Sequence, residues 1–599
     1  MKRRALVLAN ALLATLLLAP AGASAHATLV GSVPQRGATL DAQPRQVVLR
    51  FSEAVEGNFG ALRVFDGAAK RVDDGRVVHP DASGSRLAVG LKPGLADGTY
   101  VATYRVISAD SHPVSGGLVF SVGKAGTTAA PTVSELIGNS AAGPVTQAAF
   151  GLARGLTYLA TALVLGGLAF VLVVWLPALR AAAGADQEWQ EASQAFERRA
   201  RGLLLGAAAL GIASGLAGIV LQGATAGATS GWAALKTSVL RDVLGTRFGE
   251  VWGLRVLAFL ALGCALALAL RMRQPGGAAS LRRIALGADG LAAPGLPPGA
   301  PALAALPAAF IALAPALAGH AGVQPPVALL FGLDVAHVLA MSAWIGGLIF
   351  LLFALPCATR RLPGADRTRL LAATLLRFSP LALGCVVLLL LTGTIQAIEH
   401  IGSWDALLDT AFGRAVLAKV VLIAALIALG AVNRRRVVAQ LRALAKQAAP
   451  PGGAGHVLRR TLRAEVALVL VVLGVTAALV SYSPPSSLAG GPFSASTALG
   501  PLRLEATVDP ARLGPNEIHL YVLDAKDGTP SNATKQLTVT LELPAKYIGP
   551  LAVRAREAGP GHYVVDSVEL VPAGDWRLDV TSRVSEFDQY EGSLKVPVR

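Results

Sequence analysis

Residues 327–355 read VALLFGLDVAHVLAMSAWIGGLIFLLFAL, and this stretch decides what kind of fold to expect. A helix needs about 20 apolar residues to cross a bilayer. This run is longer than that, and Asp334 is its one formally charged residue. Seven further apolar runs lie near residues 147–176, 202–222, 251–270, 303–320, 379–398, 412–432 and 465–482. We therefore predict a polytopic α-helical membrane domain at residues 147–483, with eight transmembrane helices.

The composition of the whole chain agrees with a membrane protein. Its 599 residues are 53% hydrophobic and 15% charged, whereas soluble domains carry about 25% charged residues. The loops after the first, third, fifth and seventh apolar runs contain 21 Lys and Arg residues, but the opposite loops contain only Lys236, Arg241 and Arg247. Because basic loops stay in the cytoplasm, we expect both ends of the mature chain outside. The same bias explains the net charge of +16 without a nucleic-acid partner.

The amino terminus has the pattern of a secretory signal. Lys2, Arg3 and Arg4 precede a short apolar run, which ends at small residues 23–25. We predict a signal peptide at residues 1–25, so the mature chain begins at His26. The apolar run is too short to cross a bilayer.

Two segments outside the helical region alternate apolar and polar residues over short runs. Residues 26–124 predict an all-β sandwich, followed by a linker at 125–146. Residues 484–599 predict a second, C-terminal β-sandwich on the same side of the membrane. We interpret its two histidines, His519 and His562, as packing residues and assign no chemistry to this domain.

The first sandwich contains a candidate metal site. Asp110 and His112 are two residues apart, so both side chains share one face of an extended segment. A free amino-terminal His26 adds its α-amine and its ring nitrogen. Two imidazoles, an amine and a carboxylate suit the tetragonal geometry of Cu(II). The alternative is a surface turn in which Asp110 is only a capping residue.

Placing an ionisable side chain inside a membrane costs several kcal/mol of free energy, so each such residue in the apolar runs is a candidate for function. Asp334, His337 and Met341 occupy positions i, i+3 and i+7 and therefore share a helix face. Other candidates stand at the outer ends of the fourth and sixth runs: His320, Glu399 and His400. A path from these groups to Asp334, His337 and Met341 runs from hard to softer ligands, as inward copper movement requires. The alternative is that Asp334 and His337 are a structural pair joining helices.

Several of these motifs resemble known families. His26-Ala27, Ser32-Val33-Pro34, Val48 to Ser52 and Tyr104 to Phe120 resemble the CopC periplasmic copper-binding domain, a Greek-key sandwich. That resemblance implies Cu(II) ligation by His26, Asp110 and His112. The segment has no methionine, which excludes a thioether site for Cu(I). Gly319-His320, Asp334 to Gly347, Thr410 to Lys419 and Asn433 to Arg435 resemble the CopD family of inner-membrane copper proteins.

The joint resemblance implies copper passage across the bacterial inner membrane, as Cu(I) or Cu(II), rather than an enzyme. A GxxxxGK[ST] phosphate loop is missing from the sequence, and an inside-negative potential favours cation entry, so we expect import. Expected partners are the copper ion, membrane lipid and a periplasmic copper carrier or reductase. Two alternatives stay open: a cytochrome whose haem is held by His320, His337 and His400, and a module that only sequesters periplasmic copper.

Overall fold

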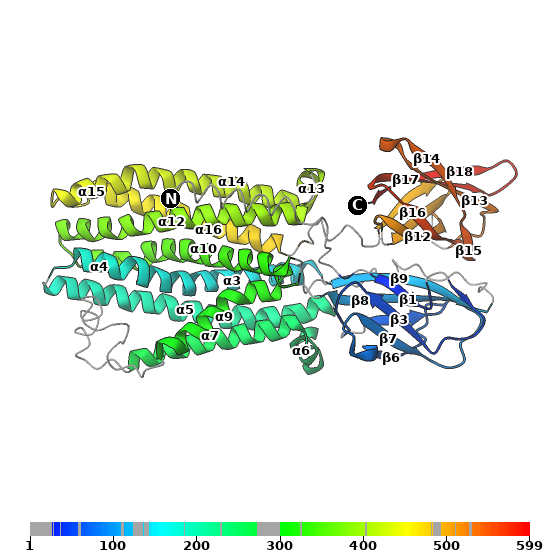
Figure 1. Ribbon diagram of the computed structural model, residues 1–599, viewed down its shortest axis with the longest axis horizontal. Coiled ribbons are helices and arrows are strands. Elements are labelled where there is room, and N and C mark those ends of the chain that lie inside the picture. The colour runs from blue at the N-terminus through cyan, green and yellow to red at the C-terminus, as the bar shows by residue number, and fades with distance from the viewer. Residues whose placement is uncertain are drawn as a thin grey trace.

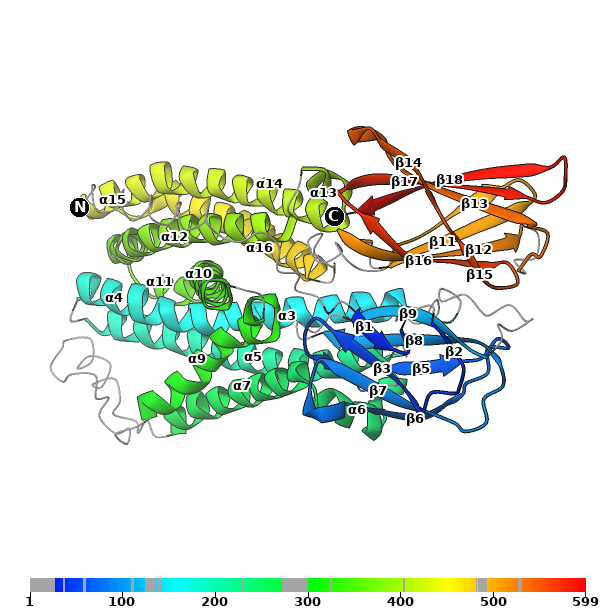
Figure 2. The same ribbon diagram turned by 45° about the vertical axis from the view of Figure 1, so that its right-hand side comes forward.

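The chain folds into a helical bundle with two β-domains at one end of it (Figures 1 and 2). This computed structural model describes residues 27, 29–35, 38–57, 61–108, 113–123, 136, 143–184, 186–227, 230–271, 300–323, 326–401, 404–480, 482, 493–509, 511–525 and 530–598. The long helices run along the longest axis of the molecule. Both β-domains lie at the same end of these long helices.

The N-terminal β-domain is a sandwich of two sheets, as predicted. One sheet has the order β1 (Leu29–Val33), β3 (Gln46–Phe51), β7 (Arg86–Leu91) and β6 (Asp73–Val78). The other has the order β2 (Thr39–Leu40), β9 (Pro113–Val122), β8 (Gly98–Ser108) and β4 (Val55–Glu56), and β5 (Leu62–Phe65) also pairs with β8. Alternate residues such as Leu49 and Tyr104 are buried between the sheets, which is why strict alternation predicted strands. The Greek-key connectivity stays a prediction.

Among the residues that the structure describes, seven helices are long and apolar enough to cross a membrane. Three consist of several elements: α3 (Pro144–Ala169), η2 (Phe170–Trp175) and α4 (Leu176–Ala182); α10 (Val327–Phe353) and α11 (Leu355–Thr359); α14 (Ala411–Val432), η5 (Asn433–Val438) and α15 (Ala439–Lys446). The others are α5 (Gln187–Ala226), α7 (Arg247–Arg271), α12 (Gly364–Ile401) and α16 (Gly452–Leu479). The short helices α6 (Thr237–Leu244) and α13 (Trp404–Asp409) lie at the end of the bundle near the β-domains (Figure 1). Seven of the eight predicted runs are thus confirmed as candidate spans.

The remaining run forms α9 (Ala300–Ala318), which contains Pro307 and Pro315. Its side chains are described from residue 305 onward, and the helix is apolar over Ala305–Ala318. Helix α9 packs against α7 and α10, within the same bundle. The eighth transmembrane helix therefore stays a prediction.

Small residues let α3 and α10 approach each other closely. Ala162 and Gly166 of α3 face Ser342 and Gly346 of α10, and each pair has the spacing that permits close helix contact in membranes. A Cβ atom added to Gly166 would lie 1.8 Å from the carbonyl oxygen of Ser342, and one added to Gly346 would lie 2.4 Å from that of Ala162. Only glycine fits at these two positions, so this contact fixes the position of the helix that carries Asp334 and His337.

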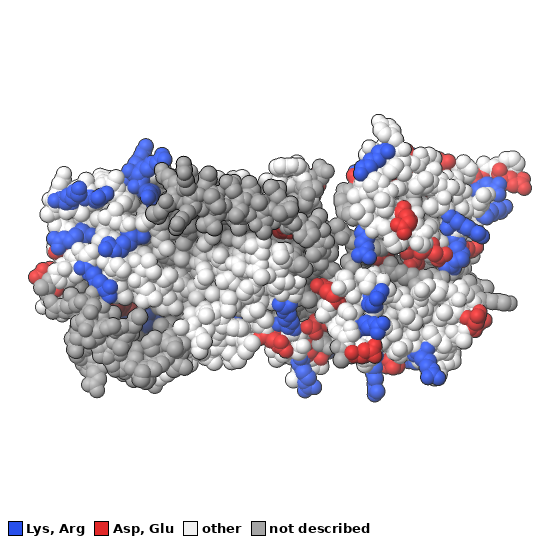
Figure 3. Space-filling view, in the orientation of Figure 1, with Lys and Arg blue, Asp and Glu red and all other residues white. Residues whose placement is uncertain are grey.

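Charge is distributed unevenly along the molecule. Lys and Arg side chains gather at the end of the helices away from the β-domains, and the middle of the bundle shows an uncharged surface (Figure 3). This arrangement agrees with the loop bias in the sequence, because the described arginine-rich connections, from α4 to α5, from α11 to α12 and from α15 to α16, lie at that end.

The C-terminal β-domain also contains two sheets. One has the order β10 (Phe493–Leu499), β11 (Leu502–Asp509), β12 (Gly514–Asp524), β16 (His562–Leu570) and β15 (Arg556–Gly559). The other has the order β14 (Ile548–Val553), β13 (Gln536–Leu543), β17 (Gly574–Arg583) and β18 (Gln589–Val598). Trp576 is fully buried between them. The two β-domains touch, because the Thr99 hydroxyl of β8 donates a 2.8 Å hydrogen bond to the Ala558 carbonyl of β15.

Candidate functional site

The three predicted outer copper ligands, His26, Asp110 and His112, lie outside the described residues. Their neighbours in the chain are described. Ala27 is 1% exposed and packs in the core of the sandwich. Ser108 ends β8 and Pro113 begins β9, and Ile107 pairs with Pro113 across the two strands. The segment with Asp110 and His112 therefore connects the two strands of a β-hairpin.

This hairpin end of the sandwich faces the helical bundle. Ile107 of β8 also pairs with Glu56 of β4. The Glu56 carboxylate (Oε1) accepts a 3.1 Å hydrogen bond from the backbone N–H of Arg247, the first residue of α7. Burial raises the pKa of Glu56, and the Arg247 N–H and the nearby His79 oppose that rise. An acidic side chain at a helix N-terminus is favourable both as a hydrogen-bond acceptor and in the helix dipole.

A second contact joins β8 to helix α5. Arg105 donates hydrogen bonds from Nε to the Ala226 carbonyl (3.1 Å) and from Nη2 to the Thr225 carbonyl (2.8 Å). These carbonyls belong to the last turn of α5, where helix oxygens have no partner within the helix. Burial lowers the pKa of Arg105, although it remains far above neutrality for an arginine. The sandwich is thus held on the ends of α5 and α7.

Inside the bundle, His337 of α10 lies against α12. Its Nδ1 atom is 2.7 Å from the hydroxyl oxygen of Thr392. That hydroxyl donates its own proton to the Leu388 carbonyl (2.8 Å), so it accepts from His337. We infer that the neutral ring carries its proton on Nδ1, which leaves the Nε2 lone pair for a metal ion. Lys419 of α14 lies within electrostatic reach of the same ring.

Asp334, one turn before His337, has different neighbours. It lies within electrostatic reach of Tyr158 on α3, which is also near Arg154 and Arg255. Arg255 is 2% exposed, and its guanidinium lies 4.0 Å from the ring centre of Trp252. Asp334 and His337 therefore have different surroundings, although the sequence predicted that they share a helix face. His337 lies beside α12, and Asp334 lies beside α3.

The other predicted membrane residues do not join a common centre. Met341 packs against the main core of the bundle. Glu399 and His400 are half-buried near the end of α12, and the His400 ring meets Phe412 edge-on. His320 lies in the turn η4 (His320–Gly322), and its side chain is outside the described part of the structure. Across the described ranges, no three His, Cys, Asp or Glu side chains converge as metal ligands.

The C-terminal domain holds a polar cluster that the sequence analysis treated as packing. His519 Nδ1 lies 3.2 Å from His562 Nε2, and His519 Nε2 lies 3.1 Å from Glu517 Oε1. Tyr521 stacks on the His562 ring with centroids 4.4 Å apart. All four side chains are at most 3% exposed, and burial lowers the pKa of His562 well below its usual value. Residues 517, 519 and 521 are two apart and therefore lie on one face of a strand. This spacing is the feature of the sequence that could have predicted the cluster.

These features define a class: a multi-span membrane protein with a β-sandwich mounted on one end of its helices. Three family models match the chain: CopC domain at residues 29–123, Copper resistance protein D-like, N-terminal domain at 145–288, and Copper resistance protein D at 372–479. The N-terminal domain belongs to the CopC family, since "Copper resistance protein C" of Xanthomonas campestris pv. juglandis is 36% identical over 110 residues, 86% of that relative. In the same polypeptide, the helical bundle matches the two Copper resistance protein D models. The resemblance stated from the motifs is confirmed.

Individual relatives cover different parts of the chain. "Copper transport protein CutJ" of Bacillus subtilis (strain 168) is 28% identical over 584 residues, which is 96% of this chain and 97% of the relative. "Protein YobA" of Escherichia coli (strain K12) is 32% identical over 119 residues, 20% of this chain and 95% of the relative. The solved structure of CopC from Methylosinus trichosporium OB3b covers 16% of this chain and 93% of its own, at 31% identity and a TM-score of 0.15.

Proposed function

We propose that this protein imports copper across the bacterial inner membrane. The N-terminal domain captures Cu(II) outside through His26, Asp110 and His112, and the ion then passes into the helical bundle. Both β-domains stand in the periplasm, and α9 completes an eighth crossing. The relative named as a copper transport protein, which matches along nearly the whole chain, supports this assignment.

The observation that carries the proposal is the position of the capture domain. The strand ends Ile107 and Pro113, which flank Asp110 and His112 in the chain, lie beside Glu56. Glu56 and Arg105 bind the ends of α7 and α5. An ion released at this end of the sandwich would therefore be released next to the helical bundle. A protein that only sequesters copper has no need for this contact.

Within the bundle, His337 is the best-oriented acceptor for the ion. Its Nε2 lone pair is free because Thr392 holds the Nδ1 proton. Asp334, Met341, Glu399, His400 and His320 are the remaining members of the proposed path. An inside-negative potential favours entry by about 2.3 kcal/mol per charge per 100 mV, which drives the ion inward without ATP.

The direct test is copper uptake by proteoliposomes that contain the full chain, under an imposed inside-negative potential. We expect uptake that depends on the potential and is abolished by His337→Gln, with Cu(II) binding to the outer domain unchanged. His456→Gln is the matched control, because this exposed histidine lies in the first turns of α16, next to Arg459 and Arg460 in the sequence. Binding without uptake would support sequestration instead. A Soret band in the purified protein would support the cytochrome alternative.

A second test addresses the capture site. One alanine inserted directly before His26 removes the free α-amine from that residue. We expect a large loss of Cu(II) affinity, and unchanged affinity would refute the proposed ligand set. His79→Gln serves as the control, since His79 is exposed and donates from Nδ1 to the Arg86 carbonyl.

A further inference from the structure

A pocket lies between α5 and α11 at the end of the bundle away from the β-domains. Its volume is about 450 Å³. It is lined by Ala195, Arg198, Arg199, Cys357, Arg360 and Arg361. Four of these six side chains are therefore guanidinium groups, and none is acidic. The proposed copper path does not use any of them.

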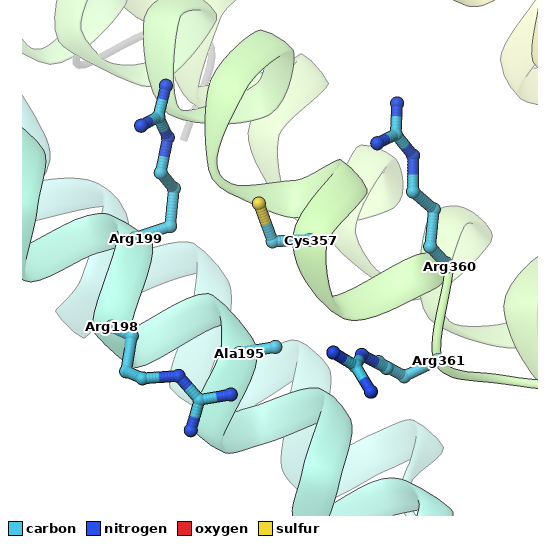
Figure 4. A pocket seen from close by; sticks show the side chains of 6 residues that line it. All are labelled: Ala195, Arg198, Arg199, Cys357, Arg360 and Arg361. Atoms are coloured by element: carbon cyan, nitrogen blue, oxygen red, sulfur yellow. The ribbon is translucent and has the colours of Figure 1, made fainter.

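Helix geometry brings the four arginines together. Ala195, Arg198 and Arg199 are three and four residues apart on α5 and so face the same side. Arg360 and Arg361 follow directly after the last residue of α11. Figure 4 shows Arg198 and Arg361 extended toward each other, while Arg199 and Arg360 stand on either side of Cys357. The small side chains of Ala195 and Cys357 leave the space between the arginines open.

Within the described part of the chain, no acidic residue lines this pocket. The nearest acidic residues in the sequence are engaged elsewhere: Glu197 accepts a hydrogen bond from Ser193, and Asp366 pairs with Arg369. Four like charges around one cavity repel each other, and a bound anion removes that repulsion. The planar guanidinium fork binds phosphate oxygens in pairs, which makes phosphate the best-matched anion.

The level of the pocket in the membrane indicates where the phosphate comes from. Arg199 stands four residues, or about 6 Å, before the apolar run of α5 that begins at Leu203. Arg360 follows the last residue of the α10–α11 span. Both positions correspond to the headgroup layer. Phe353, whose carbonyl is 3.7 Å from the Cys357 thiol, is 43% exposed and offers an apolar surface beside the pocket for an acyl chain.

We propose that this pocket binds the phosphate headgroup of an anionic phospholipid of the cytoplasmic leaflet. Basic pockets between transmembrane helices on the cytoplasmic side are suited to such headgroups. The positive-inside rule alone requires basic residues at this end, but it does not require that four of them line one open pocket. The bound lipid ties α5 to the end of the α10–α11 span.

The test uses the full chain purified in a neutral detergent and depleted of lipid. Thermal unfolding is followed during titration with phosphatidylglycerol, phosphatidylcholine or inorganic phosphate. Two double variants, R198Q/R199Q and R360Q/R361Q, each remove half of the pocket charge. R435Q/R436Q is the matched control, because this adjacent, exposed pair lies at the same end of the bundle outside the pocket. Native mass spectrometry counts the lipid that stays bound.

We expect phosphatidylglycerol to raise the unfolding temperature, and each pocket variant to weaken its apparent affinity roughly 10- to 30-fold. The control pair keeps the wild-type response. Equal losses in all three variants would show general surface attraction and overturn the proposal. Stabilisation by inorganic phosphate at the same phosphate concentration would overturn the lipid assignment. If a pocket variant is too unstable to titrate, retained lipid in its mass spectrum overturns the site, and lipid lost only from pocket variants supports it.

Discussion

Replacing Thr392 with valine tests whether the orientation of His337 matters for transport. Valine has nearly the same shape as threonine, so the packing of α12 against α10 is kept. The substitution removes the oxygen that accepts the Nδ1 proton of His337 at 2.7 Å. It also removes the hydroxyl donor to the Leu388 carbonyl, which still accepts from the helix backbone.

The expected magnitude follows from these contacts. The His337 N–H loses its acceptor in a region without water, which costs about 1–3 kcal/mol. The ring can then turn or change its tautomer, so Nε2 is no longer fixed as the free lone pair. Loss of such a partner to a metal-ligating histidine lowers metal affinity or activity about 10- to 100-fold. We therefore expect copper uptake by Thr392→Val to fall within that range.

The assay is uptake into proteoliposomes at fixed potential, combined with thermal unfolding of each variant. Thr374→Val on the same helix is the control, because Thr374 is fully buried and its hydroxyl donates only to the Leu370 carbonyl. Thr392→Ser should restore uptake, since serine keeps the hydroxyl. Wild-type uptake by Thr392→Val, while His337→Gln is inactive, would refute the argument about the tautomer.

Three further perturbations follow from the structure. Arg105→Gln loses its charged contacts with the last turn of α5, which weakens docking by about 1–2 kcal/mol, so uptake should slow while Cu(II) binding to the outer domain stays unchanged. Because the pKa of His562 is lowered in the folded domain, the unfolded chain binds a proton at this histidine at a higher pH than the folded chain does. The stability of the C-terminal domain should therefore fall by up to about 1.4 kcal/mol per pH unit below pH 6.5. His562→Gln should remove this slope from unfolding curves measured at different pH values. Gly166→Ala should lower the unfolding temperature in detergent because its Cβ collides with α10, whereas Gly206→Ala, with open space around its Cβ, should not.

The sequence predicted the architecture because its signals are local. The period of two in the segments at 26–124 and 484–599 became buried alternate residues in β-sheets, and seven apolar runs became long helices. The run at 303–320 is the exception. It forms the 19-residue helix α9, which contains two prolines and whose side chains are described only from residue 305, so its crossing of the membrane stays a prediction.

The surroundings of the candidate residues could not be predicted in the same way. The sequence singled out His337 because an ionisable side chain in a membrane-spanning helix costs free energy. Its partner Thr392, however, is 55 residues away on another helix. The contact of Arg105 with α5 spans 120 residues, and Arg105 was an ordinary strand residue by its pattern. His519 and His562, 43 residues apart, were correctly expected to pack, yet only strand pairing shows that they meet. Such contacts depend on helix packing and strand register, which a single sequence does not encode locally.

The way the capture domain docks also fixes its orientation. Glu56 binds the N-terminus of α7, where free N–H groups carry partial positive charge, and Arg105 binds the C-terminus of α5, where free carbonyls carry partial negative charge. The Thr246 hydroxyl accepts a hydrogen bond from the Gly249 N–H in the first turn of α7. The Arg247 N–H in the same turn has no acceptor within the helix, and Glu56 supplies one. Because α5 and α7 are antiparallel neighbours, they present opposite poles at this end of the bundle. A sandwich turned by half a rotation would place each charge against the wrong pole. The polarity of two helices, rather than any single side chain on them, therefore keeps the ends of β8 and β9 at Ile107 and Pro113 turned toward the bundle.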